Sequence, residues 1–253
     1  MIQRVLNIFR KSNFYLALRY SWLHDLYTQW KYPAYFKHKV AESEMYTQII
    51  KTYLPENPLI FDIGANIGDL SIAFKKAGAR VVSVEPDPIN LTHLKYRNKK
   101  ALFTIEPTAI GNIDGQIPFY VHLRDNALST AKTLNLSDFE TTTVESQKIQ
   151  TLIAKYGKPD FIKIDAEGFE WPILQHLSLP IQMVCFEINF PEFQDDAIHI
   201  INHLHTLSPD YKFNISTNDE NLSFEKYIDI QVMLSLINNF KGKYAMIFCL
   251  LEK

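Results

Sequence analysis

Acidic side chains follow three apolar runs of this sequence, each close to the point where the run ends. Asp62 lies in "LIFDIG", Glu85 ends "VVSVEP", and Asp165 with Glu167 follows the apolar part of "FIKIDAEGFE". Carboxylates in such places can accept hydrogen bonds from ribose hydroxyls, hold a cation, or take a proton from a reacting hydroxyl. The sequence therefore predicts a polar site where several strands end.

A glycine-rich turn follows the first of these acids. It reads "GANIG" over residues 64–68 and leads into a stretch of helical period. The first β-α turn of a parallel sheet is a common ligand site, because its glycines let the backbone approach the ligand and the free amides of the next helix face it. Glu85 follows about 20 residues later, where a carboxylate can bind both hydroxyls of a ribose. We expect this turn to bind a nucleoside.

Two features distinguish the turn from a dinucleotide site. Asn66 stands where the pattern G-x-G-x-x-G has its central glycine, which disfavours a pyrophosphate on the turn. Asp62 places a carboxylate nearby, which suits a cationic or amine-bearing ligand better than a polyphosphate. S-adenosylmethionine carries both an amine and a sulfonium, so we interpret the turn as a class I methyltransferase site.

An α/β sheet would position these groups. Apolar runs of strand length alternate with stretches of helical period, which is typical of β-α-β units and a mostly parallel sheet. We expect strands at residues 58–64, 79–86, 102–110, 159–168 and 181–190, and a closing antiparallel hairpin at 211–217 and 244–253.

Four blocks of the sequence resemble the FkbM family of S-adenosylmethionine-dependent methyltransferases, and they occur in the family's order between about residues 58 and 190. They are "FDIGANIG", "VVSVEPDPINLTHLKYRN", "AIGNIDGQIPFYV" and "DFIKIDAEGFEWPIL" followed by "CFEI". The resemblance implies a doubly wound, Rossmann-like sheet of seven strands with S-adenosylmethionine as cofactor. We divide the chain into a basic, aromatic helical extension packed on the domain (residues 1–57) and the methyltransferase domain (residues 58–253).

The resemblance also implies which residues meet the cofactor. It puts the residues of the turn around the methionine part, Glu85 on the ribose, the backbone near Ala109 and Ile110 beside the adenine, and Asp165 with Glu167 near the methyl group. One departure is Ile153, where the family commonly has Asp after Thr-Leu, so a supporting contact is in question there. The expected cofactor-binding residues are Asp62, Gly64, Ala65, Asn66, Gly68, Glu85, Pro86, Ala109, Ile110 and Asp165.

Asp165 and Glu167 are the candidate catalytic residues. Methyl transfer to a hydroxyl needs the two reactants in line and a group that takes the hydroxyl proton. Glu167 and Glu170 have an alternative role in capping the helix that follows, and Lys163 has one as a structural partner of a carboxylate. We expect no metal site, although Asp165 together with Glu187 and Asn189 offers oxygen ligands for magnesium as an alternative.

Substrate contacts are expected around the polar segment 124–148, which leaves the sheet between two strands of the site. Loops of this length in a domain are often functional, although a passive surface loop is the alternative. The candidates are His122, Arg124 and Ser129, with Glu187 and Asn189 from the end of a strand.

The N-terminal segment differs in composition from the rest of the chain. Its first 40 residues contain seven Lys or Arg and one acid, Asp25, together with many aromatic residues. Such a segment could contact an anionic membrane surface or sugar rings, and the alternatives are a helical cap on the sheet or the contact of a homo-oligomer. The net charge of −2 disfavours nucleic acid as a partner.

Compartment is indicated by three features. Cys185 and Cys249 lie in apolar runs and are interpreted as buried hydrophobic residues of a reducing compartment. No apolar run reaches the roughly 18 residues of a membrane span, and charged residues interrupt the N-terminal region, so no signal peptide is expected. We expect a cytoplasmic protein, with peripheral contact at the inner face of the membrane as a further option.

The expected activity is methyl transfer from S-adenosylmethionine to a hydroxyl of a sugar, a glycolipid or another small acceptor. The resemblance alone suggests a polysaccharide pathway of bacterial surfaces. The alternatives are N-methylation of a small metabolite and a nucleoside-binding partner protein without catalysis, for which Ile153 is the one hint.

Overall fold

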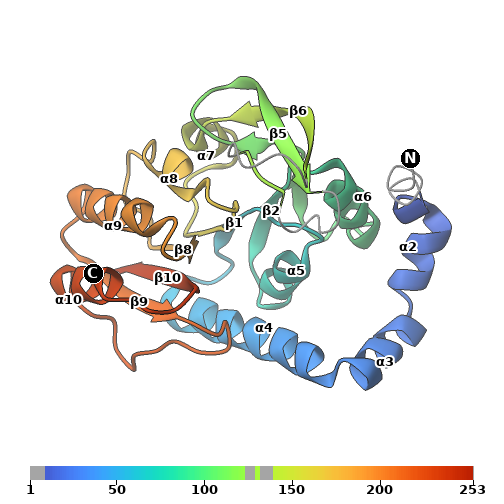
Figure 1. Cartoon of the computed structure of the whole chain (residues 1–253), viewed down its shortest axis with the longest axis horizontal. Helices are drawn as coiled ribbons and strands as arrows, with labels where there is room; N and C mark the ends of the chain where they lie inside the picture. The colour runs from blue at the N-terminus through green and yellow to red at the C-terminus, as the bar shows by residue number, and fades with distance from the viewer. Residues whose placement is uncertain (1–8, 123–128, 132–138, 253) are drawn as a thin grey trace.

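A seven-stranded sheet runs through the middle of the computed structural model, which describes residues 9–122, 129–131 and 139–252 (Figure 1). The strand order is β3-β2-β1-β7-β8-β10-β9, with β10 antiparallel to both of its neighbours and the other pairs parallel. The predicted α/β class, the mostly parallel seven-stranded sheet and its antiparallel C-terminal strands are therefore confirmed. The strands are β1 (Leu59–Ile63), β2 (Arg80–Val84), β3 (Thr104–Glu106), β7 (Phe161–Ile164), β8 (Met183–Asn189), β9 (Tyr211–Ser216) and β10 (Tyr244–Leu251).

Helices cover both faces of this sheet. Because side chains alternate along a strand, Ile60 of β1 belongs to one apolar core and Phe61 to the other. One core packs against α4 and α5, and the second against α7 to α10. Cys185 and Cys249 are free and buried in these cores, as predicted. The helices of the domain are α5 (Asp69–Lys76), α6 (Pro88–Arg97), α7 (Ile149–Tyr156), α8 (Glu170–Leu174), α9 (Gln194–Leu207) and α10 (Ile230–Asn238).

A second sheet of three strands, in the order β4-β6-β5, lies beside the first (Figure 1). It contains β4 (Ala109–Ile110), β5 (Gly115–His122) and β6 (Phe139–Gln147). Two predictions were wrong here. The expected strand 102–110 breaks into β3 and β4, which belong to different sheets, and the expected loop 124–148 includes β6. The sequence "FETTTVESQ" of β6 hid the strand because only Val144 and Ser146 are buried in it.

The N-terminal helices are α2 (Asn13–Arg19), α3 (Trp22–Lys31) and α4 (Pro33–Tyr53). The second half of α4 packs on the sheet through its buried Met45, Tyr46, Ile49 and Ile50. We call residues 9–44 the N-terminal arm; Figure 1 shows it leaving the sheet and turning back toward α6. The division of the chain near residue 57 stays a prediction.

The arm touches α6 again through α2. Leu16 is buried, the Tyr20 hydroxyl lies 2.8 Å from Nδ1 of His93, and the Arg97 guanidinium lies 5.1 Å from the centroid of the Tyr20 ring. Helix α3 buries no residue. Within the described ranges, no helix is both long and apolar enough to cross a bilayer.

Candidate functional site

The carboxyl ends of β1, β2 and β7 meet the three-stranded sheet at a cavity that we call the inner cavity. Parallel strands end at one edge of a sheet, so residues that are distant in sequence come together there. The cavity is lined by Ile63, Gly64, Asn66, Val84, Glu85, Pro86, Asn90, Thr108, Ala109, Ile110, Phe119, Ser129, Ala131, Asp165, Ala166, Glu167, Phe169 and Ile173.

Two further cavities continue from the inner one toward the arm. The middle cavity shares Gly64, Asn66, Asn90 and Asp165 with the inner cavity, and it also includes residues of the arm. The outer cavity lies between the arm and α5, and its lining shares Arg19, Tyr35, Lys39, Glu42, Ile67, Asp69 and Leu70 with the middle cavity. The three cavities thus form one path from the edge of the sheet to the arm.

Glu85 lies at the end of β2 and is buried. Its Oε2 accepts the Asn66 N–H at 2.7 Å, and its Oε1 accepts the Asp87 N–H at 2.8 Å. Burial and the nearby charge of Asp87 raise the pKa of the Glu85 carboxyl to about 8, although the two backbone hydrogen bonds act in the opposite direction. A ligand that donates hydroxyl groups to Glu85 would stabilise its charged form.

The turn after β1 requires glycines because neighbouring protein atoms leave no room for a side chain. A Cβ on Gly64 would lie 1.7 Å from the Asp165 carbonyl oxygen, and one on Gly68 would lie 2.4 Å from a methyl carbon of Leu94. Both glycines have positive φ, at 76° and 85°, and Asn66 between them has φ 51°. Gly64 lines the inner cavity, as expected for a residue beside a ligand, and the missing side chains of both glycines also allow chain segments of the protein to approach each other.

Asp62 and Lys163 are buried neighbours on β1 and β7, and they face α4 and α5. Asp62 Oδ2 accepts a hydrogen bond from the Ser71 hydroxyl at 2.5 Å, whereas its buried Oδ1 has no hydrogen-bond partner among the described residues. Lys163 Nζ lies 3.9 Å from that oxygen and 3.3 Å from Asp165 Oδ2. Burial raises the pKa of Asp62, while Lys163 acts to lower it. Burial lowers the pKa of Lys163, but Asp165 and Asp62 outweigh it, so the net shift is upward.

The segment after β7 turns sharply at Glu167 and Gly168, which have φ values of 51° and 88°. Glu170 holds this turn, since its Oε1 accepts the Ala166 N–H at 2.8 Å and the Gly168 N–H at 3.3 Å. The Thr130 hydroxyl donates to the Glu167 carbonyl at 3.0 Å. Burial raises the pKa of Glu170 to about 7. Glu170 therefore shapes the turn that presents Glu167.

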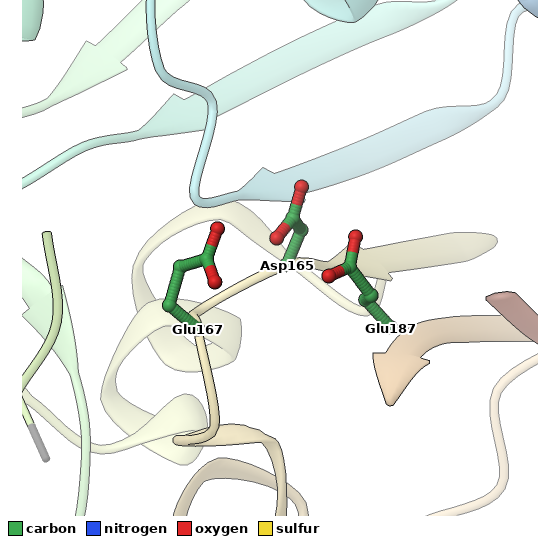
Figure 2. A group of neighbouring side chains, drawn as sticks. All are labelled: Asp165, Glu167 and Glu187. Carbon is green, nitrogen blue, oxygen red and sulfur yellow. The ribbon is translucent and has the colours of Figure 1, made fainter. Parts of the chain in front are cut away.

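Three carboxylates converge just beyond this point (Figure 2). Asp165, Glu167 and Glu187 each offer an oxygen, and these oxygens all lie within 4.8 Å of one another. Burial, followed by the charges of Asp165 and Glu167, raises the pKa of Glu187 to about 9. Asn189 Nδ2 donates to Glu187 Oε1 at 3.1 Å, so Asn189 supports the group instead of adding an oxygen to it. Such a cluster can bind hydroxyls and accept a proton.

Most of the residues predicted from the sequence come together here. Gly64, Asn66, Glu85, Pro86, Ala109, Ile110, Ser129, Asp165 and Glu167 line the inner cavity, and Asp62 and Ala65 line the middle one.

Other predicted residues lie elsewhere. Gly68 is the N-cap residue of α5 and packs against Leu94. His122 ends β5, where its N–H donates to Ser129 Oγ and its ring packs on Phe139. Arg124 lies outside the described residues.

Sequence reasoning missed several lining residues. Asn90 and Thr108 carry no pattern that marks them, and Phe169 follows the acids as an ordinary apolar residue. The arm residues Arg10 and Arg19 line the middle cavity from far away in sequence. Lys163 gave a signal, because a lone lysine within the apolar strand "FIKI" must find a partner. Ile153 packs against the apolar core.

The lining fits S-adenosylmethionine. Glu85 would hold the ribose, and the apolar side chains of Ile63, Val84 and Ile110 would contact the adenine in the inner cavity. In the middle cavity, Asp62 Oδ1, which accepts no hydrogen bond from the described residues, suits the ammonium group of the methionine part. The site thus offers the Glu85 carboxylate to the ribose, an apolar pocket to the adenine ring and the Asp62 carboxylate to the ammonium group.

Comparison with known proteins gave one family match. The model of the methyltransferase FkbM domain matches residues 62–215, which include the last two residues of β1, the lining of the inner cavity and the three carboxylates. A search of curated proteins found no match.

The comparison with solved structures gave matches of low sequence identity. Precorrin-6y C5,15-methyltransferase from Geobacter metallireducens is 11% identical, with a TM-score of 0.46 over 85% of this chain and 87% of its own. The plantazolicin methyltransferase BpumL, in complex with a desmethylPZN analog and SAH, is 10% identical, with a TM-score of 0.44 over 100% of both chains. Aeropyrum pernix fibrillarin with natively bound S-adenosyl-L-methionine is 10% identical, with a TM-score of 0.44 over 84% of this chain and 74% of its own.

Proposed function

Since this chain belongs to the methyltransferase FkbM domain family and is an S-adenosylmethionine-dependent methyltransferase, we propose that it methylates a hydroxyl oxygen of a sugar, either free or carried on a lipid. When bound, the cofactor supplies an electrophilic methyl group. The protein then has to bind the acceptor hydroxyl, aim it at that methyl group and take its proton as the new oxygen–carbon bond forms.

The observation that carries the proposal is the convergence of Asp165, Glu167 and Glu187 (Figure 2). A hydroxyl is a poor nucleophile until its proton is shared with a base, and a carboxylate within hydrogen-bond reach supplies one. Asp165 lines both the inner and the middle cavity, so it lies where the cavity assigned to the ribose and the adenine opens toward the arm. We assign it the role of base.

The neighbours of Asp165 support this role. Lys163 Nζ donates to Asp165 Oδ2 at 3.3 Å and so fixes the side chain, leaving Oδ1 to face the acceptor. Burial and the charges of Asp165 and Glu167 raise the pKa of Glu187 and so favour its protonated form. Glu187 can therefore donate a hydrogen bond to an acceptor oxygen while Asp165 accepts one.

A saccharide fits the path that leads outward. The middle cavity presents Tyr15 and Tyr35 as flat faces, and Arg10 and Arg19 as hydrogen-bond donors. Sugar rings bind through such combinations of aromatic faces and charged hydrogen-bond partners. The continuous cavities would accommodate an elongated acceptor, such as a short glycan, better than a single small metabolite.

We place the reaction in the cytoplasm. The free, buried Cys185 and Cys249 fit a reducing compartment. The net charge of −2 gives no support to a nucleic acid as acceptor. A role in polysaccharide biosynthesis follows from the proposed acceptor.

The test is transfer of an isotope-labelled methyl group from S-adenosylmethionine to a panel of monosaccharides, glycans, lipid-linked glycans and small amines. The expected product is a methyl ether on a sugar, identified by mass spectrometry and NMR. Labelled N-methyl products would replace the proposal with N-methylation. Cofactor binding without transfer to any member of the panel, or to a cell extract, would favour a binding protein without catalysis.

A further inference from the structure

The N-terminal arm exposes an unusual number of large apolar side chains. Of the 15 exposed large hydrophobic residues among the described parts of the chain, 12 lie between residues 9 and 40. The side chains of Trp30, Phe14 and Trp22 are 80%, 72% and 69% exposed. The full set in the arm is Phe9, Phe14, Leu18, Trp22, Leu23, Leu26, Tyr27, Trp30, Tyr32, Tyr35, Phe36 and Val40.

Helix α3 turns its apolar side away from the protein. Trp22, Leu26 and Trp30 are spaced four residues apart, so they share one side of the helix, and all three are exposed. His24 and Thr28, on the other side, line the outer cavity against α5. A helix on a protein surface ordinarily buries its apolar side, so this reversed orientation marks a contact surface.

The charges of the same segment indicate what the surface contacts. Between residues 9 and 40 the chain has six basic residues and one acidic residue, Asp25. Lys11, Lys31 and Lys37 are exposed, and so is Asp25, which also lines the outer cavity, so the exposed charges of the segment are mainly positive. Aromatic side chains flanked by lysines are typical of helices that lie in the interface of an anionic bilayer.

We propose that the outer face of the arm docks onto an anionic lipid bilayer. Trp22, Leu26 and Trp30 of α3 enter the headgroup region, and Lys31 and Lys37 contact lipid phosphates. A second copy of this chain is a poorer occupant, because pairing two such faces would bring like charges together. The anionic bilayer matches both the apolar and the basic character of the arm.

Docking would place the path to the site close to the lipid surface. The outer cavity lies directly behind the arm, and through the middle cavity it reaches Asp165. An acceptor held in the bilayer would then have a short route to the carboxylates, a consequence that rests on the proposed function. The docking itself does not depend on the acceptor.

Vesicle binding of the full chain tests the proposal. The chain has three tryptophans, so Trp171→Phe leaves only Trp22 and Trp30 as fluorophores. We expect this variant to co-float with vesicles of phosphatidylcholine and phosphatidylglycerol, and its emission to shift to shorter wavelength as the two indoles leave water. Vesicles of phosphatidylcholine alone should bind it more weakly.

Substitutions identify the surface. Trp22→Ser combined with Trp30→Ser, made in the wild-type chain, should weaken binding at least tenfold in flotation, because two large apolar groups are lost. Lys31→Gln and Lys37→Gln should each weaken binding to the anionic vesicles by about fivefold, and should do so less in high salt. Val232→Ser is the matched control, since Val232 is 53% exposed on α10, away from the arm, and its loss should leave binding unchanged.

Two results would overturn the proposal. One is a failure of vesicle binding to follow the arm: in flotation at low salt, either the wild-type chain does not bind the anionic vesicles, or the arm variants bind them as well as the wild type does. The other is a lipid-free dimer, seen by sedimentation, that the tryptophan substitutions dissociate; the face would then be a contact between two copies. Melting curves and cofactor binding of each variant show that it is folded, and neither outcome bears on methyl transfer, because no acceptor is present.

Discussion

The backbone N–H of Asn66 donates a hydrogen bond of 2.7 Å to Oε2 of Glu85, and thereby joins the turn after β1 to the end of β2. The same carboxylate accepts the Asp87 N–H through its other oxygen. Glu85 is therefore held by two backbone donors in the wall of the inner cavity, with both oxygens fixed before a ligand arrives.

Removing the Glu85 carboxylate should weaken the binding of S-adenosylmethionine. A hydrogen bond to a charged group contributes about 1.5–3 kcal/mol, so Glu85→Gln should raise the dissociation constant roughly 10- to 100-fold. Isothermal calorimetry measures this change. Glu225→Gln, at an exposed position, is the control and should bind as wild type does. Equal affinity in all three proteins would contradict the placement of the ribose at Glu85.

The pH dependence of cofactor binding should report the same carboxylate. With a pKa of about 8 in the free protein, Glu85 is mostly protonated at pH 6. Ribose hydroxyls that donate to the carboxylate favour its charged form, so binding releases the proton, and affinity should rise from pH 6 to pH 8 and level off above it. The steepest possible slope is about tenfold per pH unit. Calorimetry with S-adenosylhomocysteine in buffers of different ionisation enthalpy would count the proton, and a slope that persists in Glu85→Gln would assign it to another group.

Gly64 should be the least replaceable glycine of the turn. Gly64→Ala places a Cβ against the Asp165 carbonyl and also strains a backbone with φ of 76°. Gly78 has a similar φ of 99°, but a Cβ added there would lie in open space. Urea unfolding should show a cost of about 1–2 kcal/mol for Gly78→Ala from the backbone conformation alone. The cost of Gly64→Ala should exceed it by roughly 2 kcal/mol or more, because backbone must shift. Similar costs for the two variants would mean that β1 and β7 end farther apart than described.

Lys163 should stabilise the fold by compensating the charges of the buried Asp62 and the half-buried Asp165. Lys163→Met leaves Asp62 and Asp165 without their cation, and breaking a buried pair in this way costs about 3–5 kcal/mol. The surface pair of Lys212 with Asp229 provides the contrast, because water screens an exposed pair and Lys212→Met should leave the free energy of unfolding nearly unchanged. Adding Asp62→Asn to Lys163→Met should restore part of the loss, and a double variant no more stable than Lys163→Met would disprove the pairing.

Asp165 and Glu167 should differ in their effect on catalysis. Asp165→Asn removes the assigned base and should lower kcat by about 10²–10⁴-fold while the variant stays folded. Glu167→Gln should mainly raise the KM for the acceptor, since Glu167 lies beside Asp165 in the carboxylate cluster and would bind an acceptor hydroxyl instead of taking its proton. Steady-state kinetics with the acceptor found by the methyl-transfer panel measures both constants, and a larger loss of kcat in Glu167→Gln would reverse the assignment.

Much of the central sheet could be predicted from the sequence, because the patterns that identify its strands are local. The strands around Asp62, Glu85 and Asp165 are apolar runs that end in an acid, and parallel strands place their carboxyl ends at one edge. The hairpin of β5 and β6 could not be predicted in the same way. Its polar faces lack the apolar alternation that identifies a strand, and its β6 is specified by pairing with β5.

The sequence by itself determined which strands carry an acid near their carboxyl ends, where the glycine turn lies, and which class of cofactor the turn suits. Each of these depends on residue types at short spacings. Only the tertiary structure decided how these groups share space. It brought Glu187 beside Asp165 and Glu167, set Lys163 between Asp62 and Asp165, and placed the Asp165 carbonyl where a side chain on Gly64 would lie. It also left the apolar side of α3 exposed, because a helical period specifies which residues share a side but not what that side will face.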